Sequence, residues 1–354
     1  MKRNSSIDYL KFLFSVIVLL YHYGLWFDGG YIVVEGFFMI TGFLMMAALY
    51  RKKDAPDLSP AGTFNFVFRK YKAIFLPLLF SAASGYLIYE LLIFENTLKV
   101  ALKDAAMLLF EVVPLQMAGF EGFWATGVSW YLSAMLLAIA ILHPIAKRGP
   151  ERFAYTVCPT LTLLVYGLLC FNYHQLDVNA HWLLGVLNGG VLRAMAGIAA
   201  GCFLYALALH AKPQLTLRAR VAYTAIELAA LCYLLRSMMI ETLHRNGHDF
   251  VLAVVIFLIL YFELSEKSLI AHYCKHRFTK ALATASTYIY MNHYAWNIYF
   301  KHIMITEKTP FQLLPWYVLC VATSSVAAWL LTVLVRFVCR KTADHSSKSA
   351  AKAA

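Results

Sequence analysis

Residues 8–27 read DYLKFLFSVIVLLYHYGLWF and residues 31–50 read YIVVEGFFMITGFLMMAALY, with Asp28-Gly29-Gly30 between them. Each run is apolar and has the length of about 20 residues that a helix needs to cross a bilayer. The Asp-Gly-Gly sequence is typical of a turn. The start of the chain therefore predicts two antiparallel membrane helices joined by a short connection.

The same pattern continues along the chain. Eight further apolar runs lie at residues 73–94, 127–146, 153–172, 189–209, 221–243, 249–264, 282–303 and 315–336. Only 14% of the 354 residues are charged, whereas a soluble domain carries about 25%. Because backbone groups in lipid must be paired within their own segment, these runs favour helices. We predict an all-α integral membrane protein with about ten transmembrane helices, as one domain over 1–340 followed by a disordered tail over 341–354.

The basic residues predict the orientation. With the N-terminus inside, the inner connections hold 23 of the 31 Lys and Arg residues, the outer connections hold 5 and the spans hold the other 3. Because Lys and Arg are enriched on the cytoplasmic side, we expect both termini there. Anionic lipid on that side accounts for the net charge of +12 without nucleic acid. Residues 97–120, on the outer side, fit either an interfacial helix or a re-entrant segment.

Polar groups within apolar runs are costly in lipid and therefore mark candidate sites. His22 lies six residues before the predicted turn and Glu35 five residues after it. Both thus lie at a similar depth on neighbouring helices. A carboxylate bonded to one imidazole nitrogen raises the basicity of the other. We predict His22 and Glu35 as a catalytic pair, with a polar pair that only joins two helices as the alternative.

Cations gather toward the inner side of the chain. Lys11 lies eleven positions before His22, on the same helical face. Arg69 and Lys72 enter the third run just before Pro77. Such cations bind phosphates, so all three are candidates for an anionic cofactor from the cytoplasm. Alternatively, Lys11 extends to the inner surface and the cluster only reflects the basic cytoplasmic connections.

The run 282–303 contains a second histidine. Tyr290, Asn292 and His293 lie close together in mid-span, within the stretch Ser286-Thr-Tyr-Ile-Tyr-Met-Asn-His. These side chains line a pocket for an acceptor substrate or hydrogen-bond across helices.

The remaining polar groups suggest no metal. His272 and His276 have the spacing of a metal pair, but no partnering carboxylate or HExxH pattern accompanies them, and the seven cysteines are scattered without a CxxC. We interpret the two histidines as part of a basic inner connection.

Two arginines also lie within apolar runs. Arg193 and Arg236, toward the outer halves of their spans, extend outward or line an outer cleft.

Four stretches form an ordered set: Leu10-Lys11 with His22, VEGFFMITGF at 34–43, Arg69-x-x-Lys72 with Pro77, and residues 286–293. Together they resemble the motifs of the membrane-bound acyltransferase-3 family, the integral-membrane enzymes that O-acylate bacterial surface sugars. Members usually have Arg, Ser and Arg where this chain has Lys11, Thr41 and Lys72, which keep the charge or hydroxyl but change the geometry. Many also have glutamate where this chain has Met135.

The resemblance implies an acyl-CoA donor, most often acetyl-CoA, bound from the cytoplasm with Arg69 and Lys72 near its phosphates. It implies an acceptor hydroxyl on a surface polysaccharide or lipid-linked glycan at the outer leaflet, and a place in the bacterial inner membrane. His22 would be the essential residue, either as a base toward the acceptor or as carrier of the acyl group. We therefore predict an inner-membrane O-acyltransferase.

Two other functions remain as alternatives. One is a proton-coupled transporter of an anionic or glycan substrate, in which His22, Glu35 and His293 relay protons. The paired halves and broken spans of many transporters are not evident in the sequence. The other is an inactive scaffold, which Met135 in place of a glutamate keeps open.

Overall fold

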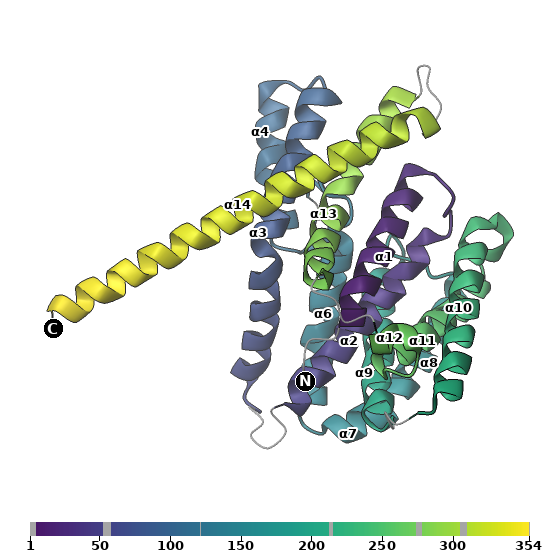
Figure 1. The fold of residues 1–354 in the computed structure, drawn as a ribbon. Coiled ribbons are helices and arrows are strands. Elements are labelled where there is room, and N and C mark those ends of the chain that lie inside the picture. Colours follow the sequence, from purple (N-terminus) through teal and green to yellow (C-terminus); the bar gives the residue numbers. More distant parts are fainter. Residues whose placement is uncertain are drawn as a thin grey trace.

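The computed structural model describes residues 5–51, 58–120, 122–211, 215–273, 278–304 and 310–353. Its long helices are α1 (Ser5–Tyr23), α2 (Val34–Tyr50), α3 (Pro60–Leu92), α6 (Ser129–Ala146), α8 (Cys158–Tyr173), α9 (Gly189–Leu209), α10 (Leu217–Met239), α11 (His248–Leu264), α13 (Thr279–Met304) and α14 (Pro310–Ala353). The short helical elements are η1 (Gly30–Val33), α4 (Leu98–Met107), α5 (Leu109–Val112), η2 (Gln116–Ala118), α7 (Pro150–Arg152), η3 (Phe153–Val157), η4 (Glu241–Leu243) and α12 (Leu269–Tyr273). Strands β1 (Trp182–Leu183) and β2 (Leu187–Asn188) form an antiparallel pair. We call the end of the bundle at which α2 ends and α3 begins the inner end, and the end at which α1 ends and η1 begins the outer end (Figure 1).

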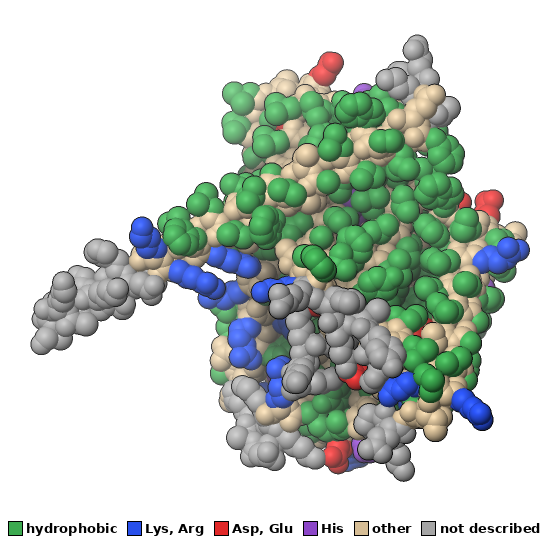
Figure 2. Space-filling model, in the orientation of Figure 1, with side chains coloured by type: hydrophobic (Ala, Val, Ile, Leu, Met, Phe, Trp, Pro, Cys, Tyr) green, Lys and Arg blue, Asp and Glu red, His purple; other side chains and the backbone are tan. Residues whose placement is uncertain are grey.

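The chain is an all-α integral membrane protein, as predicted. Seven segments of the described residues are long and apolar enough to cross a membrane: Gly30–Tyr50, Pro60–Leu92, Ser129–Ala146, Pro150–Tyr173, Gly189–Leu209, Leu217–Met239 and Pro310–Thr342. The predicted runs 8–27, 249–264 and 282–303 form α1, α11 and α13, which lie among the other helices in Figure 1. A total of ten crossings remains a prediction. In Figure 2 hydrophobic side chains cover most of the visible face, and most Lys and Arg side chains gather toward the inner end and along α14.

Helix α2 packs so closely against α9 that glycines are required at the contact. A Cβ atom on Gly42 would lie 1.9 Å from the carbonyl oxygen of Ile198, and one on Gly201 would lie 1.9 Å from that of Met39. Small residues permit this approach of helices within a membrane. Glu35 shares the α2 face of Met39 and Gly42, since residues four and seven positions apart lie on one side of a helix. The helix contact therefore turns Glu35 toward α9.

Two helix boundaries differ from the predicted ones. Helix α3 begins at Pro60 rather than at residue 73, because the Ser59 hydroxyl accepts a hydrogen bond from the Gly62 N–H at 3.1 Å and proline suits the first turn. Helix α14 continues to Ala353. The tail that we expected to be disordered is thus helical over 341–353, and its alanines and lysines are good helix formers.

Residues 97–120 stay at the outer end. Helix α4 has no buried residue, and Leu98 and Leu102 are 75% and 62% exposed. The Tyr86 hydroxyl of α3 donates a hydrogen bond to the Ala101 carbonyl oxygen at 2.9 Å, which holds α4 beside the outer part of α3. An exposed helix that carries both leucines and charged side chains, here Lys99, Lys103 and Asp104, fits the interfacial alternative in this place.

Candidate active site

His22 lies in the last turn of α1, in contact with α13. Its ring centroid lies 5.1 Å from those of His293 and Tyr294 and 4.7 Å from that of Tyr21. The side chain is partly exposed, and neither ring nitrogen forms a hydrogen bond with a described residue. A neutral imidazole in this setting has its one unprotonated nitrogen free to accept the proton of a substrate.

His293 is fully buried, and one of its nitrogens has a partner. Its Nδ1 lies 3.1 Å from the carbonyl oxygen of Ile289, which can only accept, so Nδ1 carries the proton of the neutral ring. Its Nε2 has no hydrogen-bond partner among the described residues. Buried polar atoms are rarely left unpaired. The ring next to His22 therefore carries an unprotonated nitrogen, Nε2 of His293, that has no partner among the described residues.

Of the other two predicted acceptor residues, Tyr290 lies at this site and Asn292 does not. The Tyr290 ring centroid lies 6.0 Å from that of His293 and 5.6 Å from that of Phe37. The Asn292 side chain donates a hydrogen bond at 2.8 Å to the Ser81 hydroxyl of α3. Asn292 therefore joins two helices, the alternative that the sequence had left open.

Glu35 does not pair with His22, contrary to the prediction. Its Oε1 lies 2.5 Å from Nε of Arg193, and its Oε2 accepts a hydrogen bond from the Tyr166 hydroxyl of α8. Spacing along the chain gave the depth of Glu35 but not its direction. The face of α2 that carries Glu35 packs on α9, whereas Phe37, two residues later, contacts α1.

Arg193 is completely buried. It therefore does not extend outward, although an outward direction was one of its two expected placements. Besides the pair with Glu35, its NH2 donates a hydrogen bond to the Tyr31 carbonyl oxygen at 2.9 Å. Its guanidinium lies 6.0 Å and 5.8 Å from the ring centroids of Tyr31 and Trp130. Its NH1 has no partner among the described residues. Sequence reasoning missed the pair, although an arginine within an apolar run requires a buried acid.

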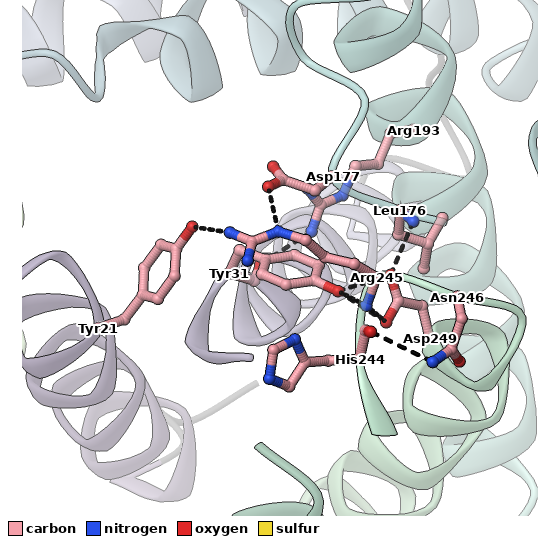
Figure 3. Close-up of polar contacts among 9 residues, drawn as sticks. All are labelled: Tyr21, Tyr31, Leu176, Asp177, Arg193, His244, Arg245, Asn246 and Asp249. Carbon is pink, nitrogen blue, oxygen red and sulfur yellow. Dashed lines mark hydrogen bonds and ion pairs between the residues drawn. The ribbon is translucent and has the colours of Figure 1, made fainter. Parts of the chain in front are cut away.

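A polar cluster joins Tyr21 and Tyr31 to the connection between α10 and α11 (Figure 3). The Tyr31 hydroxyl lies 2.7 Å from both carboxylate oxygens of Asp249. The Arg245 N–H lies 2.6 Å from the Tyr31 hydroxyl oxygen and 3.0 Å from Asp249. The Arg245 guanidinium donates to the Tyr21 hydroxyl at 3.1 Å and lies 3.4 Å from the carboxylate of Asp177. The cluster therefore reaches Tyr21, which is next to the candidate catalytic residue His22 in the sequence.

The predicted cofactor residues do not share one face: those of α3 are exposed on the outside of the bundle, whereas Lys11 of α1 is partly buried. Arg69 and Lys72 are exposed. Lys70, between them, is half-buried, with its Nζ 5.8 Å from the ring centroid of Phe66 and close enough to Lys11 for the two charges to repel. The helical period separates Lys70 from its two neighbours. The structure thus adds Lys70 to Lys11 as a second cation turned toward the bundle.

No metal site is evident in the part of the chain that the structure describes. Within it, no group of three or more His, Cys, Asp or Glu side chains is arranged to hold a metal ion. His276 lies outside the described residues, and the side chain of His272 is not described. The expectation that these two histidines bind no metal remains a prediction.

One comparison with known proteins gives a match. A model of one protein family, described as an acyltransferase domain, matches residues 4–334. The match includes every residue that the sequence singled out as catalytic or as binding a substrate. No curated protein and no solved structure matches the chain significantly.

Proposed function

The chain belongs to the acyltransferase-3 family, and we propose from this premise that it moves an acetyl group from cytoplasmic acetyl-CoA to a hydroxyl of a surface polysaccharide or lipid-linked glycan. The chain is a multi-pass membrane acyltransferase; this donor, this acceptor and the bacterial inner membrane are our proposal. The observation that carries it is the partly exposed ring of His22 beside the buried ring of His293, with no hydrogen bond to a described residue at either nitrogen of His22.

In the proposed reaction His22 acts as a general base. One ring nitrogen accepts the proton of the acceptor hydroxyl while the hydroxyl oxygen forms a bond to the thioester carbonyl carbon. The carbon–sulfur bond breaks, and the thiolate of CoA leaves and receives the proton from His22. The unpaired Nε2 of His293 offers a second basic atom beside this proton. Tyr290 and His293 remain the proposed acceptor contacts, and Glu35 positions Arg193 rather than His22.

The inner cations support a donor that carries phosphates. Arg69 and Lys72 are exposed at the inner part of α3, where phosphates in the cytoplasm can reach them. Lys70 and Lys11 are nearer the bundle. His22 lies eleven residues beyond Lys11, or about 16 Å along the helix. A donor held by its phosphates at the inner cations would have to extend its thioester over a distance of about this size to reach His22.

The joint replacement of Arg69 and Lys72 by alanine is expected to raise the KM for acetyl-CoA about 10²–10⁴-fold, because it removes two charge-assisted hydrogen bonds that contribute about 1.5–3 kcal/mol each. The kcat should stay within about twofold, since neither side chain touches the reacting atoms. Release of CoA thiol by the purified protein measures both constants. The matched control is Arg218→Ala, which removes an exposed cation from the inner end of α10. An unchanged KM in the Arg69/Lys72 variant would move the donor site elsewhere.

Transfer of radiolabel from acetyl-CoA into cell-surface glycan tests the proposed function. Membranes that contain the wild-type chain should release CoA thiol and pass label to the glycan, and membranes with His22→Ala should not. If CoA neither binds nor turns over with either chain, the acyltransferase proposal fails for this protein. The proton-coupled transporter would then be the function to test.

A further inference from the structure

We propose that Arg245, Asp177 and Tyr21 form a subsite at the outer end of the bundle that holds a neutral sugar ring of the acceptor beside His22. This inference rests on the proposed acyltransferase function. It assigns the acceptor to residues on three segments that are far apart in the sequence: the end of α1, the connection after α8 and the connection between α10 and α11.

The three side chains are accessible and already aligned. The side chain of Arg245 is 48% exposed and that of Asp177 is 26% exposed, with Nε and Oδ2 3.4 Å apart. The other edge of the guanidinium donates to the Tyr21 hydroxyl at 3.1 Å, and its centre lies 5.4 Å from the ring centroid of Tyr31 (Figure 3). The guanidinium, the carboxylate and the Tyr21 hydroxyl together present hydrogen-bond donors and acceptors in one place. Neighbouring hydroxyls of a sugar ring are ligands that fit such a pattern.

The backbone of Arg245 is held rigidly behind this surface. Its φ of +54° lies in the left-handed region, which is uncommon for a residue with a side chain. Its N–H is bound by Tyr31 and Asp249, and Asp249 also accepts a hydrogen bond from the Leu176 N–H at 2.8 Å. Strained residues that the surrounding structure holds in place are concentrated at functional sites. The connection therefore displays the guanidinium in a fixed direction.

The neighbouring residue provides an independent sign of a ligand. His244 is only 5% exposed, and neither of its ring nitrogens has a hydrogen-bond partner among the described residues. Its ring centroid lies 6.4 Å from that of Tyr31, and Figure 3 shows the ring below that of Tyr31. Burial and the charge of Arg245 lower the pKa of His244, so the neutral ring offers one donor and one acceptor. A ligand hydroxyl at this place would satisfy a group that is otherwise costly to bury.

The local charges favour a neutral ligand over an anionic one. Two cations, Arg193 and Arg245, lie in this part of the bundle with three carboxylates, Glu35, Asp177 and Asp249, so these side chains sum to a charge of −1. A phosphate or uronic acid would meet a carboxylate at every guanidinium. We therefore assign the subsite to an uncharged sugar.

The experiment uses the glycan fraction that takes up label from acetyl-CoA with the wild-type protein. Arg245→Ala should raise the amount of glycan needed for half-maximal transfer about 10–100-fold, because it removes hydrogen bonds from a charged donor. The KM for acetyl-CoA should stay within about twofold. Arg245→Lys should also raise the amount of glycan needed for half-maximal transfer, since an ammonium cannot contact Tyr21 and Asp177 as the planar guanidinium does. Arg236→Ala, which removes an exposed arginine from the outer end of α10, is the control and should behave as wild type.

Competition by soluble methyl glycosides tests the class of sugar. Neutral methyl hexosides should inhibit transfer to the glycan, and the corresponding glucuronide should inhibit less. The subsite is wrong if Arg245→Ala matches Arg236→Ala, if it raises both KM values equally, or if the glucuronide competes best. A wild-type protein that releases no CoA would instead overturn the proposed function and the subsite with it.

Discussion

His22→Ala is expected to lower the rate of acetyl transfer about 10²–10⁴-fold, the contribution of a general base. The amount of protein in the membrane should stay normal, because the ring is partly exposed and hydrogen-bonds no described residue, so its loss leaves no buried group without a partner. The initial rate of CoA release at equal amounts of protein measures the effect.

The matched control is His302→Ala, an exposed histidine near the outer end of α13. This variant should keep its rate within about twofold of wild type, as expected for a side chain away from the reacting atoms. A His22→Ala protein with more than about a tenth of the wild-type rate would contradict the role of general base. Label from acetyl-CoA that stays on the wild-type protein when no acceptor is present would make His22 the carrier of the acyl group instead.

The helices and the two histidines could be predicted because both depend on local patterns. Apolar runs of spanning length predict helices from any part of the chain, and imidazoles within such runs are conspicuous. The structure places the rings of His22 and His293 in contact across α1 and α13. Their contact could not be derived from spacing, because it depends on which helices become neighbours.

The side of a helix from which a side chain points was harder to predict than its depth in the membrane. The pairing of Glu35 with His22 was predicted from depth alone, whereas the α2 face that contains Glu35 and Gly42 turns toward α9. Gly42 was a usable signal, since small residues mark close helix contacts in membranes. Arg193 was another, because it required an acid within the bundle.

The outer cluster left no such signal. Tyr31 and Asp249 are 218 positions apart in the chain, and Asp177 and Arg245 lie in connections, where polar residues are ordinary. Nothing in the local sequence distinguishes them from other polar residues of the outer connections. Only the assembled bundle brings them beside Tyr21.

Glu35→Gln is expected to destabilise the protein by about 3–5 kcal/mol, because it leaves the charge of Arg193 buried without its carboxylate. That is a large part of a total stability of about 5–15 kcal/mol. Thermal unfolding in detergent should show a lower midpoint, and less protein should accumulate in membranes. The matched control is Glu241→Gln, which neutralises an exposed carboxylate at the outer end and should change stability by no more than about 0.5 kcal/mol.

The double variant Glu35→Gln with Arg193→Met should recover most of this loss. Replacing both members of a buried ion pair by neutral groups is often close to neutral for stability. The new amide side chain still offers an oxygen to the Tyr166 hydroxyl, and the residual cost is the Tyr31 carbonyl oxygen, which loses its donor from Arg193. Because Glu35 contacts Arg193 and Tyr166 rather than His22, the recovered protein should still release CoA from acetyl-CoA. A double variant that folds as wild type but is as inactive as His22→Ala would return Glu35 to the catalytic role that its position in the sequence first suggested.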